Sequence, residues 1–171
     1  MAVRRILVLF AAMCAAAGCG PRAAATTGPV PTVDWQRYLG RWHELARYDH
    51  RFERGLEAVT AEYALRPDGR ISVRNAGRRG SPEGEVQQAE AVARIVGPNE
   101  LSVTFFWPFS GAYRVLGVAD DYRWAVVGSH GHGYLWYLHR SPAAPPEDWT
   151  AMAAVATAHG FDTTRLLLVR H

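Results

Sequence analysis

The sequence predicts an all-β fold: an eight-stranded antiparallel up-and-down barrel with a C-terminal α-helix and a short final strand. Three observations predict it. Between residues 40 and 140, apolar and polar residues alternate within short segments, which is the period of a strand with one buried face. Turn-forming residues separate these segments at short intervals, as they do between consecutive hairpins. Beyond residue 145 the apolar period becomes that of a helix.

Eight segments are expected to be strands joined by short connections. The first begins at Gly40, and the others cover residues 59–65, 71–76, 85–96, 101–107, 111–119, 122–128 and 134–140. The turn after the second segment has a defined chemistry, because Pro67 presets φ and Gly69 accepts a positive φ. Residues 77–84 are polar and rich in glycine, and we expect them to form a loop. Eight strands enclose an interior wide enough for packed side chains or for one small ligand.

The C-terminal part of the chain is expected to contain one helix and one strand. Residues 147–159 are rich in helix formers and have acidic residues in the first turn, where the helix dipole favours them. The apolar residues of this segment recur with helical spacing: Trp149, Met152, Ala153 and Ala156. Gly160 is placed to end the helix, and residues 164–169 are expected to form the last strand.

The N-terminus has the pattern of an export signal. Arg4 and Arg5 begin it, and residues 6–17 form an apolar stretch that is too short to span a bilayer. Small residues then precede Cys19, which resembles the lipobox of bacterial lipoproteins, where the cysteine becomes an acylated first residue after cleavage. Ala16 stands where that motif usually has leucine, so a plain secretory peptide cleaved nearby is the alternative.

Three parts of the chain follow from this pattern. We expect a lipoprotein signal peptide over 1–18, a flexible tether over 19–33 and a folded domain over 34–171. Cys14 would leave with the signal, and no cysteine follows Cys19. The folded domain therefore has no disulfide and no cysteine metal site, and its stability depends on its core.

Charge excludes one class of function. The whole chain has a formal net charge of +3, but two of its arginines belong to the predicted signal peptide, so the exported part is close to neutral. The hydrophobic fraction of 49% and the charged fraction of 20% are ordinary for a globular domain. A nearly balanced domain gives no electrostatic reason to bind nucleic acid.

Three short motifs, in this order, resemble those of the lipocalins. They are Gly40-Arg41-Trp42, Asp120-Asp121-Tyr122 (with Asp120 where the family usually has threonine) and Arg140 at the end of a strand. The arginine-rich segment 47–56 resembles the bacterial outer-membrane lipocalins, which group with apolipoprotein D and the plant temperature-induced lipocalins. The resemblance implies that Trp42 plugs the closed end of a barrel and that Arg140 packs across it. These residues, with Gly40, Asp121 and Tyr122, would be structural.

Candidate ligand-binding residues follow from strand alternation inside such a barrel. Tyr134, Trp136 and Leu138 share the parity of Arg140 and are expected to point inward. The apolar face of another strand adds Phe105 and Trp107, and further candidates are Tyr63, Tyr113 and, for an anionic head group, Arg114. The alternative is that these side chains fill a solid core.

The resemblance implies carriage rather than catalysis. It implies a protein that binds lysophospholipids or fatty acids, held on the outer membrane by acylated Cys19 and facing the periplasm, with no cofactor; a homodimer is plausible from the bacterial relatives. Gly20, in place of aspartate after the cysteine, agrees with outer-membrane sorting in enteric-type bacteria. Burial of an acyl chain is worth about 0.8 kcal/mol per methylene, so a dozen methylenes outweigh the cost of association.

Other functions have weaker sequence support. His130 and His132 offer two imidazoles to a metal, but no further ligand is evident nearby, and a turn accounts for the segment equally well. A lipid hydrolase would need a nucleophile motif such as Gly-x-Ser-x-Gly, and Ser81 lies one place too early. Two rivals stay open, an enzyme built on the same barrel and an envelope lipoprotein with a filled barrel.

Overall fold

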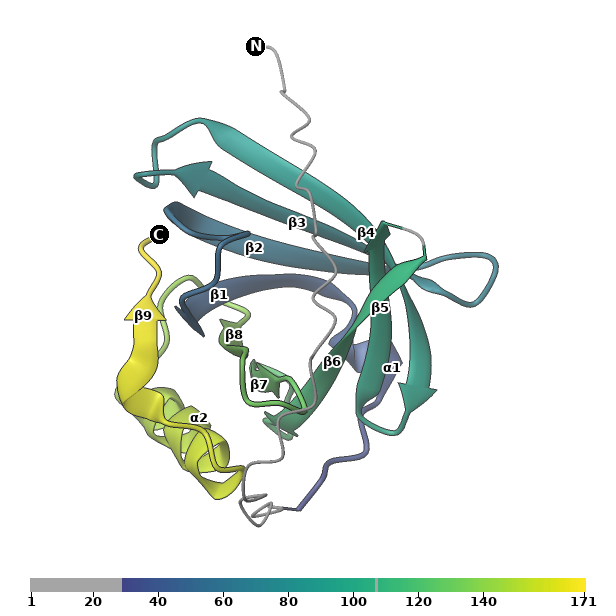
Figure 1. Ribbon diagram of the computed structural model, residues 1–171. Helices are drawn as coiled ribbons and strands as arrows, with labels where there is room; N and C mark the ends of the chain where they lie inside the picture. The colour runs from purple at the N-terminus through teal and green to yellow at the C-terminus, as the bar shows by residue number, and fades with distance from the viewer. Residues whose placement is uncertain (1–28, 107) are drawn as a thin grey trace, which may run out of the picture.

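The computed structural model describes residues 29–106 and 108–171 (Figure 1). The predicted signal peptide, Cys19, the first part of the tether and Trp107 lie outside the described residues. Eight antiparallel strands form the barrel: β1 (Gly40–Tyr48), β2 (Leu56–Leu65), β3 (Ile71–Arg79), β4 (Val86–Gly97), β5 (Glu100–Phe106), β6 (Phe109–Val118), β7 (Trp124–Gly128) and β8 (Leu135–His139). Each pairs with the next, and β1 pairs with both β8 and β2, so the barrel is closed. This confirms the predicted architecture.

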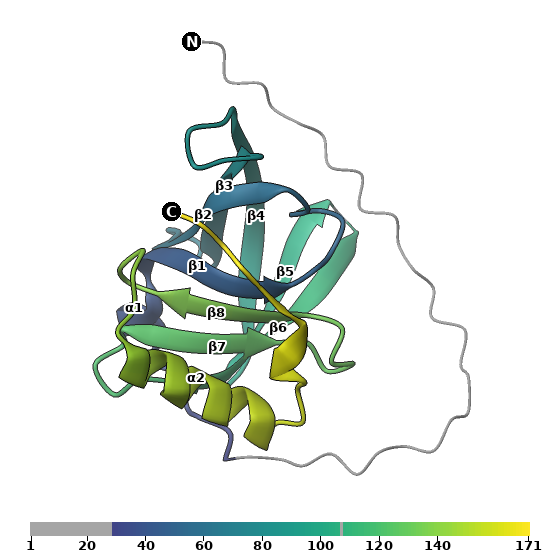
Figure 2. The same ribbon diagram turned by 90° about the vertical axis from the view of Figure 1, so that its left-hand side faces the viewer.

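Three helical elements and one more strand accompany the barrel. They are α1 (Trp35–Tyr38), α2 (Pro146–Ala158), the 3₁₀ helix η1 (Thr163–Arg165) and β9 (Leu166–Leu168). α2 lies outside the barrel along β7 and β6 (Figure 2). Among the described residues no helix is long and apolar enough to cross a membrane.

The two halves of β1 have different neighbours on one side. Residues 40–43 pair with β2, whereas Ala46, Arg47 and Tyr48 pair with β9. The C-terminal segment therefore continues the wall where β2 has separated from β1, and Ala58 donates a backbone hydrogen bond to the Arg170 carbonyl oxygen at 2.6 Å. Figure 2 shows this segment crossing β1 toward β2.

Two apolar clusters lie on opposite sides of the barrel wall. The inner cluster includes Trp42, Leu101, Val115 and Leu138 and occupies the closed end of the barrel. The outer cluster lies between the wall and α2, and in it Met152 and Ala156 are fully buried. The predicted helical face thus packs on the barrel, which confirms the helix and its position.

The structure corrects the boundary of one loop and adds one helix. β3 continues through Gly77 to Arg79, so the loop predicted for residues 77–84 begins only at Gly80. Gly77 pairs with Gln87 in this strand, and glycine suits the position because a Cβ there would lie 3.1–3.2 Å from side-chain atoms of Val59 and Leu56. The helix α1 was not predicted; it has only four residues, and Asp34 caps it by accepting hydrogen bonds from the backbone of residues 36 and 37.

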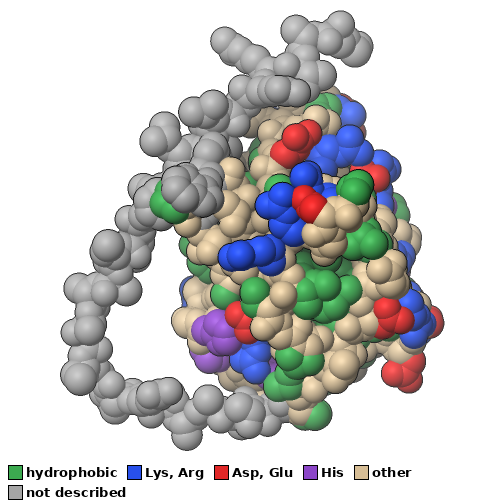
Figure 3. Space-filling model, turned by 90° about the vertical axis from the view of Figure 1, so that its right-hand side faces the viewer, with side chains coloured by type: hydrophobic (Ala, Val, Ile, Leu, Met, Phe, Trp, Pro, Cys, Tyr) green, Lys and Arg blue, Asp and Glu red, His purple; other side chains and the backbone are tan. Residues whose placement is uncertain are grey.

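Charges are mixed over the surface. On the face that Figure 3 shows, basic and acidic side chains are interspersed with hydrophobic ones. Many of them form local ion pairs, such as Arg70 with Asp68 at 2.6 Å, and this contact lowers the pKa of Asp68 to about 2. Such pairs contribute little to stability because both side chains are exposed.

Candidate functional site

The closed end of the barrel is sealed by a tryptophan beneath an arginine. Trp42 is fully buried, and the Arg140 guanidinium carbon lies 3.7 Å from the centre of its ring. Arg140 also donates hydrogen bonds to the carbonyl oxygens of Arg41 at 2.8 Å and Arg37 at 2.9 Å. The Trp42 indole N–H donates to the Tyr38 carbonyl oxygen at 2.8 Å. The structure brings together the two residues expected to form this floor, and α1 completes it.

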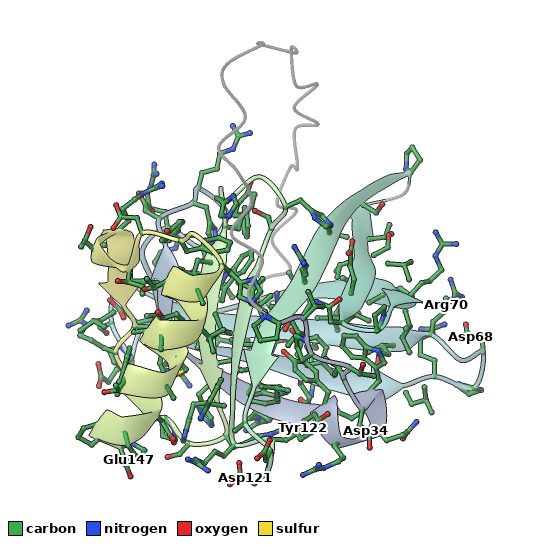
Figure 4. The ribbon with its side chains drawn as sticks, turned by 90° about the horizontal axis from the view of Figure 1, so that it is seen from below. Asp34, Asp68, Arg70, Asp121, Tyr122 and Glu147 are labelled. Carbon is green, nitrogen blue, oxygen red and sulfur yellow. The ribbon has the colours of Figure 1, made fainter. Side chains whose placement is uncertain are left out.

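A tight turn supports the floor from outside. Tyr122 has a positive φ of 62°, and its hydroxyl oxygen accepts a hydrogen bond from the Asp34 backbone at 2.7 Å. Asp121 accepts from the backbone of Arg123 at 3.1 Å. Figure 4 shows Asp34, Asp121 and Tyr122 at the same end of the molecule. Gly40 has a φ of 90°, a backbone conformation that residues with a side chain rarely adopt. It lies beside the Arg140 guanidinium.

Three tyrosines lie directly above the floor. The hydroxyl groups of Tyr38 and Tyr113 are 2.7 Å apart, and the Tyr63 hydroxyl donates to Tyr113 at 2.9 Å. Burial raises the pKa of all three, so they are neutral hydrogen-bonding groups at any ordinary pH.

One wall of the interior is made of small side chains. The register is continuous from residue 60 to residue 65 of β2 against β3, and along β3 against β4. One set of residues therefore faces inward together: Ala61, Val73, Asn75, Ala89, Ala91 and Ala93. Ala61, Asn75 and Ala89 keep partial solvent exposure although they face inward. In a solid core they would be fully buried, so this side of the barrel encloses a lumen that solvent reaches.

The opposite wall carries buried charges. Arg47 donates to a Glu44 carboxylate oxygen at 2.8 Å, and both side chains are about 5% exposed. The same guanidinium donates to the carbonyl oxygens of Glu53 at 2.9 Å and Leu56 at 3.0 Å. Arg47 therefore fixes the loop between β1 and β2 at the open end of the barrel.

The two buried carboxyl groups differ in their preferred charge. Burial raises the pKa of Glu44 well above its usual range, and the negative charge of Glu53 raises it further. Burial also opposes ionisation of Glu53, but its contacts with His50 at 3.0 Å and with the Trp136 indole N–H at 3.1 Å lower its pKa. The wall therefore opposes ionisation of Glu44 more strongly than ionisation of Glu53.

Aromatic rings surround the mouth of the lumen. Tyr134 and Trp136 stack with ring centres 5.6 Å apart and planes at 5°. His50 stacks on Phe52 at 3.8 Å and meets the edge of Trp136 at 5.3 Å. Tyr134 is 38% exposed, so this aromatic group is open to solvent from above.

Most of the predicted ligand residues line this lumen. The inward-facing ones that the structure describes are Trp136, Tyr134, Leu138, Phe105, Tyr63 and Tyr113. Trp107 lies outside the described residues. Arg114 lies on the outer face of the wall. It is opposite Glu100 in the β5–β6 pairing, and its positive charge helps to lower the pKa of His159 at the end of α2. The register moves it there because its neighbours Tyr113 and Val115 face inward.

Sequence reasoning missed the buried polar residues of the lumen: Tyr38, Glu44, Arg47, His50, Glu53 and Asn75. Strand alternation would place Ala46 and Tyr48 on the same face as Glu44. A register shift between Glu44 and Ala46 turns Arg47 inward instead. Only a weak indication of these buried polar residues is present in the sequence, namely charged residues within an otherwise apolar strand.

The candidate metal and hydrolase residues have other partners. His130 contacts Glu100 at 3.1 Å, and His132 contacts the His159 carbonyl oxygen at 2.9 Å. Within residues 29–106 and 108–171 no group of three or more His, Cys, Asp or Glu side chains is placed to hold a metal ion. Ser81 lies in the loop between β3 and β4.

A hollow of about 400 Å³ lies at β2 to β5, and Val73, Ala91 and Phe105 of the lumen wall also border it. It is lined largely by outward-facing polar side chains, among them Glu62, Ser72, Arg74, Glu90 and Thr104. Arg74 forms an ion pair with Glu62, and this contact lowers the pKa of that carboxyl. Glu62 thus lies on the outer face of the wall, whereas Glu44 lies on the inner face.

A closed eight-stranded barrel with one sealed floor, one open mouth and a helix along its side defines a class of small β-barrel proteins. Within that class, this chain belongs to the lipocalin family, because residues 33–171 match the lipocalin-like domain. Outer membrane lipoprotein Blc from Escherichia coli (strain K12) is 43% identical over 173 residues, which cover 97% of each chain. Temperature-induced lipocalin-1 from Arabidopsis thaliana is 33% identical over 150 residues, covering 80% of this chain and 78% of that one.

A solved structure agrees on the fold. Insecticyanin from the tobacco hornworm Manduca sexta superimposes with a TM-score of 0.68 at 19% identity, covering 84% of this chain and 83% of that one. The predicted resemblance to the lipocalins and to their bacterial outer-membrane members is confirmed.

Proposed function

We propose that this chain is a lipid carrier of the bacterial envelope, which binds one small hydrophobic ligand in the barrel and catalyses no reaction. The finer proposal is that the ligand is a single-chain lipid, a lysophospholipid or a fatty acid. The observation that carries the proposal is the partial solvent exposure of the inward-facing side chains, among them Ala61, Ala89 and Trp136. A filled barrel would leave these side chains no contact with solvent.

The chemistry of the lumen supports an apolar ligand. Its walls are mainly alanine, valine and aromatic side chains, and its buried charges are already paired with one another. A dozen methylenes buried at about 0.8 kcal/mol each give roughly 10 kcal/mol before the cost of association. Micromolar affinity then needs few hydrogen bonds.

The relatives support the proposed location. Several bacterial relatives are named outer membrane lipoproteins. By analogy, Cys19 would carry the acyl chains that hold this chain on the outer membrane, facing the periplasm; two or more chains suffice for stable anchoring. A homodimer stays a prediction.

The test is a titration of the full chain carrying Cys19→Ser, so that no attached acyl chain competes for the lumen. Addition of a lysophospholipid with a 16-carbon chain should change tryptophan fluorescence with saturation at micromolar concentration. Trp136→Ala should weaken binding at least tenfold, because the ring at the mouth is lost. Trp149→Ala is the matched control, since Trp149 packs in the outer cluster.

Three other results would decide against the carrier or refine it. Absence of saturable binding by either a lysophospholipid or a fatty acid would favour the filled barrel. Chemical conversion of the bound lipid, followed by mass spectrometry, would favour an enzyme. Equal loss of affinity in both tryptophan variants would mean that the lipid binds elsewhere.

A further inference from the structure

The inner end of the lumen is polar, in contrast with its aromatic mouth. Tyr38, Tyr63 and Tyr113 bring three phenol groups together, which hold three protons and make two hydrogen bonds with one another. One hydroxyl proton is therefore left without an acceptor among these three groups. Its location follows from burial.

Burial assigns that proton to Tyr113. Tyr63 donates to Tyr113, so its proton is used. If Tyr113 donated to Tyr38, the Tyr38 proton would be left unpaired in a side chain that is 1% exposed, which is unfavourable. If Tyr38 donates instead, Tyr113 accepts two bonds and directs its own proton into the lumen, from which its side chain is partly accessible.

Asn75 supplies the complementary group. Its side chain faces the lumen one residue pair further up the sheet than Tyr63, because Tyr63 pairs with Val73 and Ala61 pairs with Asn75. The amide oxygen of Asn75 is buried and accepts no hydrogen bond from any residue that the structure describes. A buried carbonyl oxygen without a donor is costly and calls for a partner.

Among the described residues the lower lumen therefore offers the Tyr113 hydroxyl and the Asn75 amide N–H groups as donors, and the Asn75 amide oxygen as an acceptor. A terminal hydroxyl group, or a protonated carboxyl group, has one of each in return. An ionised phosphate is disfavoured there, because the Arg47 guanidinium lies at the open end and is held by Glu44 and by two carbonyl oxygens, so that only its Nε has no acceptor among the described residues. The polar groups of the lower lumen therefore complement the neutral, oxygen-bearing end of a lipid chain.

We propose that the floor of the lumen binds the polar end of a long-chain fatty acid or fatty alcohol, so that the ligand lies with its oxygen atoms beside Tyr113 and Asn75 and its methyl end at the mouth. This inference rests on the proposed lipid-binding function and deepens it. It assigns Tyr113 and Asn75 as ligand-contacting residues and selects fatty acids or alcohols over lysophospholipids.

The orientation can be measured on the unchanged lumen. Two fatty acids are compared, one brominated near the methyl end and one near the carboxyl end, because bromine quenches a neighbouring indole. The contribution of Trp136 is taken as the difference between the Cys19→Ser chain and the same chain with Trp136→Phe. Methyl-end bromines should quench this contribution more strongly. Stronger quenching by carboxyl-end bromines, or equal quenching, would overturn the proposal.

A substitution tests the donor. Tyr113→Phe should weaken the binding of hexadecanol and palmitic acid about five- to tenfold, the loss expected for one hydrogen bond, and should weaken lysophospholipid binding less. Tyr137→Phe is the matched control, because the Tyr137 hydroxyl is buried in the outer cluster and makes no hydrogen bond to a described residue. Unchanged affinity in Tyr113→Phe would contradict the proposal.

The two proposals fail differently. If neither fatty acids, fatty alcohols nor lysophospholipids bind, the carrier function itself is wrong. If they bind but the quenching pattern is reversed, the carrier function stands and only the inward orientation of the polar end is wrong.

Discussion

Two tryptophans stand at opposite ends of the same lumen, and the contrast between them separates stability from ligand binding. Trp42 at the floor is fully buried, stacked under Arg140 and bonded to a backbone carbonyl. Trp136 at the mouth is only partly buried, stacked on an exposed tyrosine and bonded to a loop carboxylate. The polar groups of Trp42 and Arg140 are paired within the protein, whereas the mouth keeps surface available for another molecule.

The largest expected effect is at the floor. Trp42→Ala should lower the free energy of unfolding by about 3–5 kcal/mol, because it leaves a cavity and removes the ring beneath Arg140. Urea unfolding followed by circular dichroism measures this. A loss below about 1 kcal/mol would mean that the floor does not hold the barrel together.

A smaller loss is expected for the arginine that covers this ring. Arg140→Lys should cost about 2 kcal/mol, because an ammonium group cannot stack flat on the indole and also reach the carbonyls of Arg41 and Arg37. The same unfolding experiment applies. Stability equal to that of the unmodified chain would show that charge alone, without the planar guanidinium, suffices.

The attachment of α2 beside the floor should depend on pH. Asp148 accepts hydrogen bonds from Arg123 at 2.7 Å, and its pKa is lowered by this contact first and by His139 second. A lowered pKa adds stability above the unfolded value of about 3.9, and that stability is lost as the pH falls through the folded value. Asp148→Asn should therefore cost about 1 kcal/mol at pH 7, a modest figure because Arg123 is 48% exposed.

Thermal unfolding of both chains between pH 7 and pH 2 checks this linkage. The difference between them should shrink as the pH falls. A difference that stays constant over this range would mean that the carboxylate charge of Asp148 is not the source of the stabilisation.

The smallest effect on stability is expected at the mouth. Tyr134→Ala removes a 38% exposed ring and should change the free energy of unfolding by about 0.5 kcal/mol or less. Lipid affinity should nevertheless fall severalfold, because the ring that stacks on Trp136 is lost. Parallel unfolding and titration experiments compare the two quantities; a large stability loss with normal affinity would reverse the proposed division between floor and mouth.

The sequence predicted the parts of the fold that depend on local periodicity. The eight strands and the C-terminal helix follow from alternation and turn residues, and the contact between Trp42 and Arg140 was implied by the resemblance to the lipocalins. α1 was missed because four residues give too short a pattern, although it supplies Tyr38 to the floor.

The polar part of the lumen was unpredictable for a different reason. The register shift after Glu44 changes which residues of β1 face inward, and no local pattern marks it. The contact between Tyr38 and Tyr113 joins residues 75 positions apart, so only the closed barrel creates it. Arg114 shows the reverse error, since its charge suggested a ligand contact but its register places it outside.

The pairing of β9 with β1 has a consequence for how the chain acquires its structure. Ala46 lies opposite Leu168, so the two partners are separated by most of the folded sequence. Native pairings this distant in the chain delay folding into the millisecond-to-second range. Because β9 is synthesised last, the upper half of β1 gains this neighbour only after the rest of the domain has been made.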